Sequence, residues 1–377
     1  MSSLARGRFI LRSPCRPQYN AFLLRQSHKL FSTTSGSLQS QPSNDKNAPN
    51  IVVAPEAHEI NAPLSTLPAD LSLPETLPPT AAIPAKLQRF IALGRAYLTF
   101  YKTGLKNVYR NYRASLPLRK ELGLPAYLPI SPPRKVSNPI ASEKASNVGP
   151  ASSKNTYDIR NLGLGRGQFQ LVRRSARDVR RMIPFTLILI ICGEFTPLVI
   201  PIFGSAITPA TCRVPGQIAK ERETASKRKA LALQAWIDAN PESGLGAMPE
   251  STSDESFKLL IQLANPAWVG TAKPASVLQA CAVFGLVKKH DRFAGTALTG
   301  LIYRRRLSQY LEYLAIDDAM IRGGGGIEKL SYAEVRIALD ERGAGEVGDA
   351  IRRDCSVEEV ESFERNWLSK WLTSRET

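Results

Sequence analysis

Hydrophobic positions in the second half of the chain recur at helical spacing. Short apolar candidates lie at residues 231–238 and 256–263, and longer helices are predicted from Pro274 to about Lys288 and from Thr296 to about Ile321. Four consecutive glycines at 323–326 then interrupt the pattern, because glycine supports helical geometry poorly. No strand pattern of any length competes, so the periodicity predicts an all-α fold.

Two capping boxes mark the last helices. Ser331 with Glu334 opens a helix that should stop at Gly343, and Ser356 with Glu359 opens one that should run to about Leu372. The last helix carries one continuous apolar face, which is most simply a core stripe and otherwise a peptide-binding groove: Val357, Val360, Phe363, Trp367, Leu368 and Trp371.

An acid-free amphipathic helix is predicted over residues 85–116. Hydrophobic and tyrosine side chains recur at helical spacing, and Lys102, Lys106, Arg110 and Arg113 form a second stripe. Aromatic rings settle at the headgroup level of a bilayer, and each Lys or Arg near an anionic surface gains about 1 kcal/mol. The helix therefore either binds an anionic lipid surface or is a core helix with a solvated basic face.

A transmembrane span is predicted at residues 183–203, inside a segment 158–203 that begins as a basic helix. Its 21 residues would extend about 31 Å at about 1.5 Å each, close to the thickness of a bilayer core. Glu194 lies near the centre. An intramembrane carboxylate is either an ion or proton relay or a neutral, hydrogen-bonded structural group beside a kink, and both interpretations remain open. A buried core helix is the third option.

Arginines gather before this span and would attract anionic lipid heads. We take as lipid-contact candidates Arg173, Arg174, Arg177, Arg180 and Arg181. A second basic cluster in the helical half could meet ribosomal RNA phosphates, or could be a solvated face balanced by Asp317 and Asp318. Its candidate contacts are Lys288, Lys289, Arg304, Arg305 and Arg306.

The amino-terminal segments have no folding pattern of their own. Residues 1–44 hold six basic side chains and no acid, which is the composition of a mitochondrial presequence. Proline-rich stretches at 45–84 and 117–157 should be extended, disordered linkers. The remaining segment, 204–377, is expected to be the helical domain.

Composition limits the chemistry. The net charge of +17 lies entirely in residues 1–203, with 27 basic and 10 acidic side chains, whereas residues 204–377 hold 23 of each. The neutral half gives no reason to expect DNA binding. The five cysteines and three histidines lie far apart, so no metal site or disulfide framework is expected. No paired nucleophile and base is evident, no cofactor is expected, and we expect a protein that is not an enzyme.

Three stretches together resemble the LETM family of mitochondrial inner-membrane proteins. The first is residues 169–203, with Gly193-Glu194-Phe195 in a proline-containing span. The second is residues 304–343, in which Asp317-Asp318, Glu334 and Arg342-Gly343 fall in the family's order. The third is the final helix, residues 356–372.

The resemblance implies a fold and a function. It implies a single transmembrane helix followed by a 14-3-3-like matrix domain that binds mitochondrial ribosomes, with roles in protein insertion and ion homeostasis. This chain lacks the family's coiled-coil extension and EF-hand, so calcium sensing is not implied. Two alternatives remain: a potassium/proton exchanger component using Glu194, which would need a homo-oligomer, and a membrane scaffold held on anionic lipids by the two basic helices.

Overall fold

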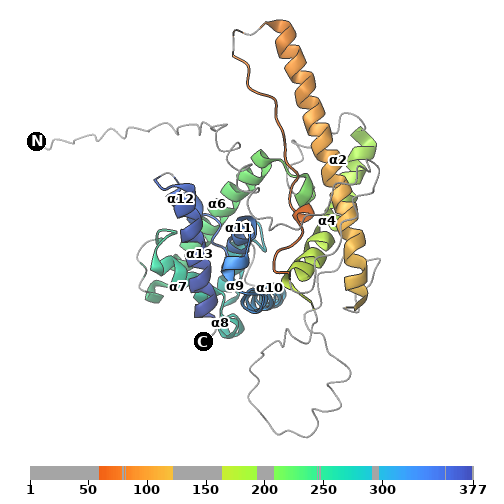
Figure 1. The fold of residues 1–377 in the computed structure, drawn as a ribbon. Coiled ribbons are helices and arrows are strands. Elements are labelled where there is room, and N and C mark those ends of the chain that lie inside the picture. The colour runs from red at the N-terminus through yellow and green to blue at the C-terminus, as the bar shows by residue number, and fades with distance from the viewer. Residues whose placement is uncertain are drawn as a thin grey trace, which may run out of the picture. The chain divides into compact units, whose positions relative to one another are not determined.

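A computed structural model describes residues 59–78, 80, 82–121, 164–192, 208–243, 245, 248–290, 297–352 and 354–375. These residues all lie within Ile51–Thr377, a single compact unit. All regular secondary structure among them is helical (Figure 1), which confirms the all-α prediction. The α-helices are α2 (Ile83–Glu121), α4 (Arg166–Cys192), α6 (Pro215–Ala239), α7 (Asp254–Leu263), α8 (Pro266–Thr271), α9 (Pro274–Val283), α10 (Ala297–Gly323), α11 (Tyr332–Glu341), α12 (Val347–Ile351) and α13 (Val357–Ser374). Single 3-10 turns are η1 (Leu64–Thr66), η5 (Ala210–Cys212), η6 (Pro241–Ser243) and η7 (Ile327–Lys329).

The main core surrounds α9. Every residue of α9 from Ser276 to Val283 is buried, and α6 and α10 pack on either side of it. Pro274 begins this helix because a first-turn proline loses no helical hydrogen bond. Helix α9 ends at Val283, earlier than the predicted Lys288, because Gly285 takes a φ of 71° that other residues rarely adopt.

The last helix closes this core. Val360, Leu368 and Trp371 are fully buried, and Trp367 stacks on Trp371 while meeting Phe257 of α7 edge-on. The predicted apolar stripe is therefore a core face. Its capping box forms as expected, since Ser356 and Glu359 each cap the other's backbone N–H.

The capping box predicted at Ser331 forms only in part. Ser331 Oγ accepts from the Glu334 N–H at 3.4 Å, but the Glu334 carboxylate turns into the core instead of returning to Ser331. The Ser331 N–H donates to Asn61 Oδ1 at 2.8 Å. A segment remote in sequence thus replaces the local partner.

Residues 59–78, which we expected to belong to a disordered linker, pack against the helices. Ile60, Ala62 and Thr66 are buried, and Asn61 also donates to the Lys329 carbonyl at 2.8 Å. Asn111 of α2 exchanges hydrogen bonds with Ser65. The prolines prevent this stretch from forming an α-helix, apart from the single 3-10 turn η1, but leave its side chains and carbonyls available for contacts of this kind.

Helices α2 and α4 form an antiparallel pair (Figure 1). Near one end Phe100 and Tyr101 pack on Phe185, and near the other Leu118 packs on Leu171 and Val172. Helix α2 passes through Pro117, where we had placed the start of a second linker, because its last turn is buried through Leu118 and Arg119.

The transmembrane span is not supported. Among the described helices none is long and apolar enough to cross a membrane. The apolar end of α4, from Ile183 to Cys192, would extend only about 15 Å, half of a bilayer core. The rest of the predicted span, residues 193–203 with Glu194, lies outside the described part of the chain.

The close approach of α2 to η5 generates a stability prediction. A Cβ on Gly104 would lie 2.7 Å from Cys212 Sγ and 2.8 Å from the Thr211 carbonyl oxygen, so the backbones must separate. We expect Gly104→Ala to lower the free energy of unfolding by about 1–3 kcal/mol. On the same helix a Cβ on Gly94 would meet nothing within 4 Å, so Gly94→Ala should raise the free energy of unfolding by up to about 1 kcal/mol. Urea unfolding of both variants measures these free energies, and equal stabilities of the two variants would contradict the close packing of α2 against η5 at Gly104.

Candidate functional site

A buried ion-pair network joins α4 to α10 and α11. Its members come from three stretches far apart in sequence, and six of them carry formal charge: Arg166, Arg174, Asp317, Asp318, Glu334 and Arg342. All six residues are at most 7% exposed. Within this set three guanidinium groups face three carboxylates, and Arg375 adds a fourth guanidinium 3.7 Å from Asp318 at the edge of the network.

Two arginines of α4 share one carboxylate. Arg174 donates to both oxygens of Glu334, at 2.6 and 2.8 Å, in the bidentate geometry that makes such pairs strong. Arg166 donates to Glu334 at 3.0 Å and to Asp317 at 2.8 Å. It also donates to the Ile60 carbonyl, so the packed segment before α2 joins the same centre.

The other half of the network is organised by Arg342, directly after α11. Its guanidinium donates to Asp317 at 2.9 Å and to Asp318, while Trp371 of α13 donates to the second Asp318 oxygen at 3.3 Å. Burial alone would raise the pKa of Asp317, but Arg166 and Arg342 hold that pKa well below its usual range. Asp317 therefore stays ionised, and the network is a structural lock.

These pairings correct one expectation. Asp317 and Asp318 do not balance the basic side chains of Arg304–Arg306, because both aspartates are buried and engaged by other arginines. Of the second basic cluster, Arg304 donates to the Ala272 carbonyl at 2.6 Å, and Lys288, Lys289, Arg305 and Arg306 are exposed.

A second, more open arginine group lies on another face of α4. Arg173 pairs with Glu341, stacks over the Tyr313 ring at 3.5 Å, and is joined there by the Tyr313 hydroxyl, which donates to Glu341 at 2.6 Å. Arg177 reaches within 3.8 Å of the same carboxylate and is 44% exposed. Burial would raise the pKa of Glu341, yet Arg173 and Arg177 lower it to about 2.

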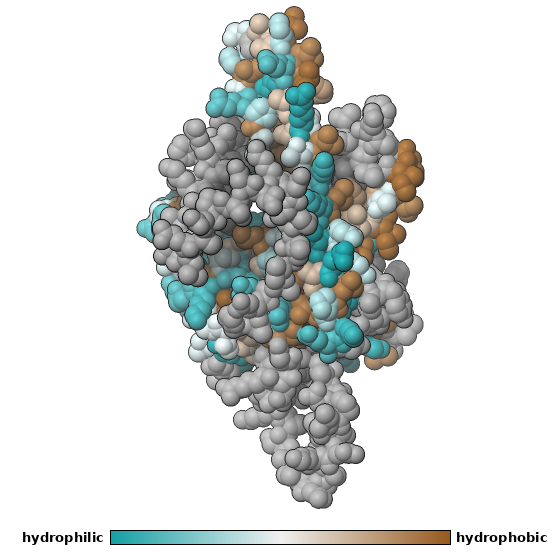
Figure 2. All heavy atoms as spheres, turned by 45° about the vertical axis from the view of Figure 1, so that its right-hand side comes forward, coloured by the Kyte–Doolittle hydropathy of each residue, from teal (hydrophilic) through white to brown (hydrophobic). Residues whose placement is uncertain are grey.

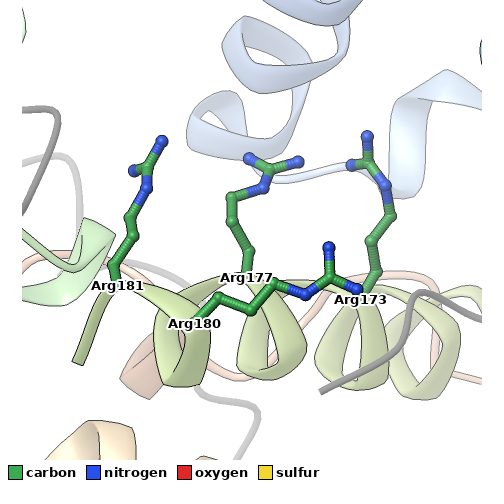
Figure 3. Close-up of a pocket in the computed structure, with 4 residues that line it drawn as sticks. All are labelled: Arg173, Arg177, Arg180 and Arg181. Carbon is green, nitrogen blue, oxygen red and sulfur yellow. The ribbon is translucent and has the colours of Figure 1, made fainter. Parts of the chain in front are cut away.

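Four arginines of this face line a pocket of about 220 Å³: Arg173, Arg177, Arg180 and Arg181. Figure 3 shows Arg173, Arg177 and Arg181 rising from successive turns to the same side, while Arg180 runs along the helix. Four of the five lipid-contact candidates thus share a pocket. The fifth, Arg174, is buried in the ion network and cannot contact lipid.

Apolar side chains are exposed at the beginning of α2 and the end of α4. On α2 they are Ile83, Leu87, Phe90, Ile91 and Leu98, and on α4 they are Ile183, Leu187, Ile190 and Ile191, each 48–82% exposed. Hydrophobic spheres lie on the surface drawn in Figure 2 among hydrophilic ones. We call these two sets the α2 stripe and the α4 stripe. In the sequence these positions are indistinguishable from the apolar positions of the same helices that are buried, such as Phe100 and Phe185.

The described residues offer little for catalysis or metal chemistry. Among them no group of His, Cys, Asp or Glu side chains is arranged to hold a metal ion. The buried thiols of Cys212 and Cys281 have pKa values raised to about 12 by burial, so they stay protonated and unreactive at neutral pH.

The fold and the site define the class of protein: it is an all-α protein with a buried ion-pair network, two exposed apolar stripes and an arginine-lined pocket. Residues 85–249 match the sequence model of the pentamidine resistance factor domain family. Comparisons with curated proteins and with solved structures gave no match. The matched region begins within the first turn of α2 and runs past the end of α6. It contains the pocket, the α4 stripe and the α2 stripe except Ile83.

This match corrects the LETM resemblance. The matched family is a different one, so the expectations of ribosome binding and of potassium/proton exchange through Glu194 are not supported, and the 14-3-3-like arrangement loses its basis. Asp317-Asp318, Glu334 and Arg342, on which the resemblance relied, are the buried lock. Their role could have been suspected from the sequence by asking which arginines neutralise two adjacent aspartates that directly follow the apolar residues Leu314 to Ile316.

The Glu341 cluster generates a pH prediction. Because the folded pKa of about 2 lies below the usual 4.5, the pairing stabilises the fold fully above pH 4.5, and this contribution, on the order of 3 kcal/mol, is lost as the pH falls towards 2. Glu341→Gln should therefore be less stable than the wild type at pH 7 and lose less stability between pH 7 and 3. The exposed Glu328→Gln should keep the wild-type dependence. Urea unfolding across this range is the measurement, and parallel curves for all three proteins would contradict the assignment.

Proposed function

We propose that this protein is a peripheral membrane scaffold, held on an anionic membrane surface by the first half of α2 and the end of α4. The observation that supports this proposal most directly is the pair of exposed apolar stripes. Ile83, Leu87, Phe90 and Ile91 repeat at the same intervals as Ile183, Leu187, Ile190 and Ile191. This spacing of four, three and one residues places each set on one side of its helix.

The antiparallel packing brings the two stripes to one end of the helix pair. Phe100 packs against Phe185, so the residues before Phe100 and those after Phe185 continue past this contact in the same direction. No residue of α2 before Phe100 is buried. A surface that contacts one stripe can therefore contact the other as well.

Charge favours a membrane as the occupant of these stripes. Helix α2 carries nine basic side chains and one acidic one, Glu121, at its far end. Basic residues bordering the stripe, such as Lys86 and Arg95, would meet lipid phosphates while the apolar side chains enter the acyl boundary. Each basic residue contributes about 1 kcal/mol near an anionic surface, and each fully buried large apolar side chain about 1.5–3 kcal/mol. Two stripes suffice for stable attachment.

We further propose that this membrane is mitochondrial and that the protein is not an enzyme. The presequence-like residues 1–44 support the location. The buried charges of the lock support a scaffold, since they are paired with one another and leave no acid or base poised in a cleft. The α6–α13 bundle is the part that such a scaffold presents.

Vesicle binding tests the proposal directly. The variant Phe90→Ser/Ile91→Ser/Ile190→Ser/Ile191→Ser removes two large exposed apolar side chains from each stripe, and we expect it to bind vesicles containing phosphatidylglycerol at least about tenfold more weakly in flotation assays. A matched control is Leu301→Ser/Ile302→Ser, which alters two exposed apolar residues of α10. The control should bind like the wild type. Equal binding by all three proteins would overturn the role of the stripes.

Cells offer a second test, which also uses the name of the matched family. We propose that the chain supports tolerance of pentamidine from the membrane surface, because the matched residues contain the α4 stripe and all of the α2 stripe except Ile83. The wild type should fractionate with mitochondria and be released by carbonate, and the four-residue variant should be released by salt alone and leave cells as sensitive to pentamidine as a deletion does. The α10 control should behave like the wild type. Resistance to carbonate would replace peripheral attachment with a membrane span.

A further inference from the structure

We infer that the pocket lined by Arg173, Arg177, Arg180 and Arg181 binds a phosphate group with two or more negative charges. The pocket lies on the side of α4 that faces the end of α11 and the beginning of α6. Arg173 pairs with Glu341 of α11, and Arg177 and Arg181 interact electrostatically with Glu221 of α6. The pocket is therefore distinct from the apolar stripes. The inference needs no membrane, although a lipid source for the phosphate would rest on the proposed function.

The spacing of the arginines builds the site. Arg173, Arg177 and Arg181 are four residues apart, which places their side chains one above another on one helix face, and Figure 3 shows their guanidinium groups on the same side. Arg173 is fixed by its pair with Glu341 and its stacking on Tyr313. One wall of the pocket is thus preorganised, which lowers the cost of ordering side chains on binding.

The three carboxylates near the pocket neutralise its four arginines only in part. Glu341 pairs with Arg173, lies 3.8 Å from Arg177 and accepts from the Tyr313 hydroxyl, while Glu221 pairs with Arg213. Asp178 accepts from the Ala210 N–H at 2.8 Å. The charge of Arg173, together with burial, lowers the pKa of Arg177, so the arginines repel one another. A bound anion would relieve this repulsion.

Phosphate is the chemistry that this arrangement fits best. The planar guanidinium donates two parallel hydrogen bonds to phosphate oxygens, and several such groups can surround one tetrahedral anion. A single carboxylate offers only two oxygens and one charge to four arginines. At about 220 Å³ the pocket is smaller than the roughly 300–1,000 Å³ of sites for drug-sized ligands, which suits a phosphate or pyrophosphate group.

The phosphate could come from a lipid headgroup or from a soluble phosphate compound. Arg181 lies two residues before Ile183, where the α4 stripe begins. The headgroup of a lipid in a membrane bound to the stripes could therefore reach the end of the pocket where Arg181 lies. A soluble ligand would enter from solvent without any membrane.

Calorimetric titration of the full chain with pyrophosphate, and separately with a water-soluble short-chain phosphatidic acid, tests the inference. Arg177→Gln/Arg181→Gln should weaken binding of at least one probe by about tenfold or more, because charge-assisted hydrogen bonds to two guanidinium groups are lost. Arg305→Gln/Arg306→Gln removes the same charge from exposed positions of α10 and should bind like the wild type. Circular dichroism melting of each variant establishes that it is folded.

The outcomes distinguish a lipid from a soluble source of the phosphate, and they distinguish failure of the phosphate site from failure of the proposed membrane attachment. Binding of pyrophosphate supports a site for soluble phosphates, and binding of phosphatidic acid alone supports a headgroup site. Failure of both probes, or equal weakening by the pocket and α10 variants, overturns the inference. Neither probe is a membrane, so these results do not depend on vesicle binding by the stripes. Conversely, loss of vesicle binding in the stripe variant would leave pyrophosphate titration unchanged.

Discussion

The carboxylate of Asp317 is the constraint on which the rest of the structure depends. It is fully buried and ionised, and it is shared by Arg166 from α4 and Arg342 from the end of α11. Removing one partner of a buried pair leaves an uncompensated charge, which typically costs about 3–5 kcal/mol. The bundle can therefore close only when α4 is in place. The position of α4 in turn fixes the antiparallel α2 and the end of the pair where both stripes emerge.

Helix α4 divides three tasks among its faces. Arg166, Gln170 and Arg174 follow one another at intervals of four residues and point into the lock, where Gln170 also donates to Asp317. The series of Arg173, Arg177 and Arg181 is offset by one residue, and this offset turns it towards the pocket instead. The apolar stripe then begins at Ile183. Arginines that look alike in sequence thus serve stability or binding according to their angular position.

The sequence predicted the helices because their signals are local. Ser356 with Glu359, the first-turn proline of α9 and the spacing on α13 each act within a few residues, and all three appear in the structure. Helices α8 and α12, of six and five residues, were missed because so short a stretch has no periodicity to detect. The LETM resemblance failed for a related reason. Paired aspartates and an Arg-Gly helix end satisfy general needs for charge pairing and helix termination, so they do not define one family.

The sequence by itself determined the all-helical class, the helix ends with strong caps, and the concentration of positive charge in the first half. Only the tertiary structure decided which charges are buried, because Arg166 and Asp317 are 151 residues apart and nothing local pairs them. It also decided that Glu334 leaves its capping box for Arg174, and that residues near Asn61 pack instead of serving as a spacer. The physical reason is that buried charges and unpaired backbone groups take their partners from whatever the fold brings within hydrogen-bonding distance, irrespective of separation along the chain.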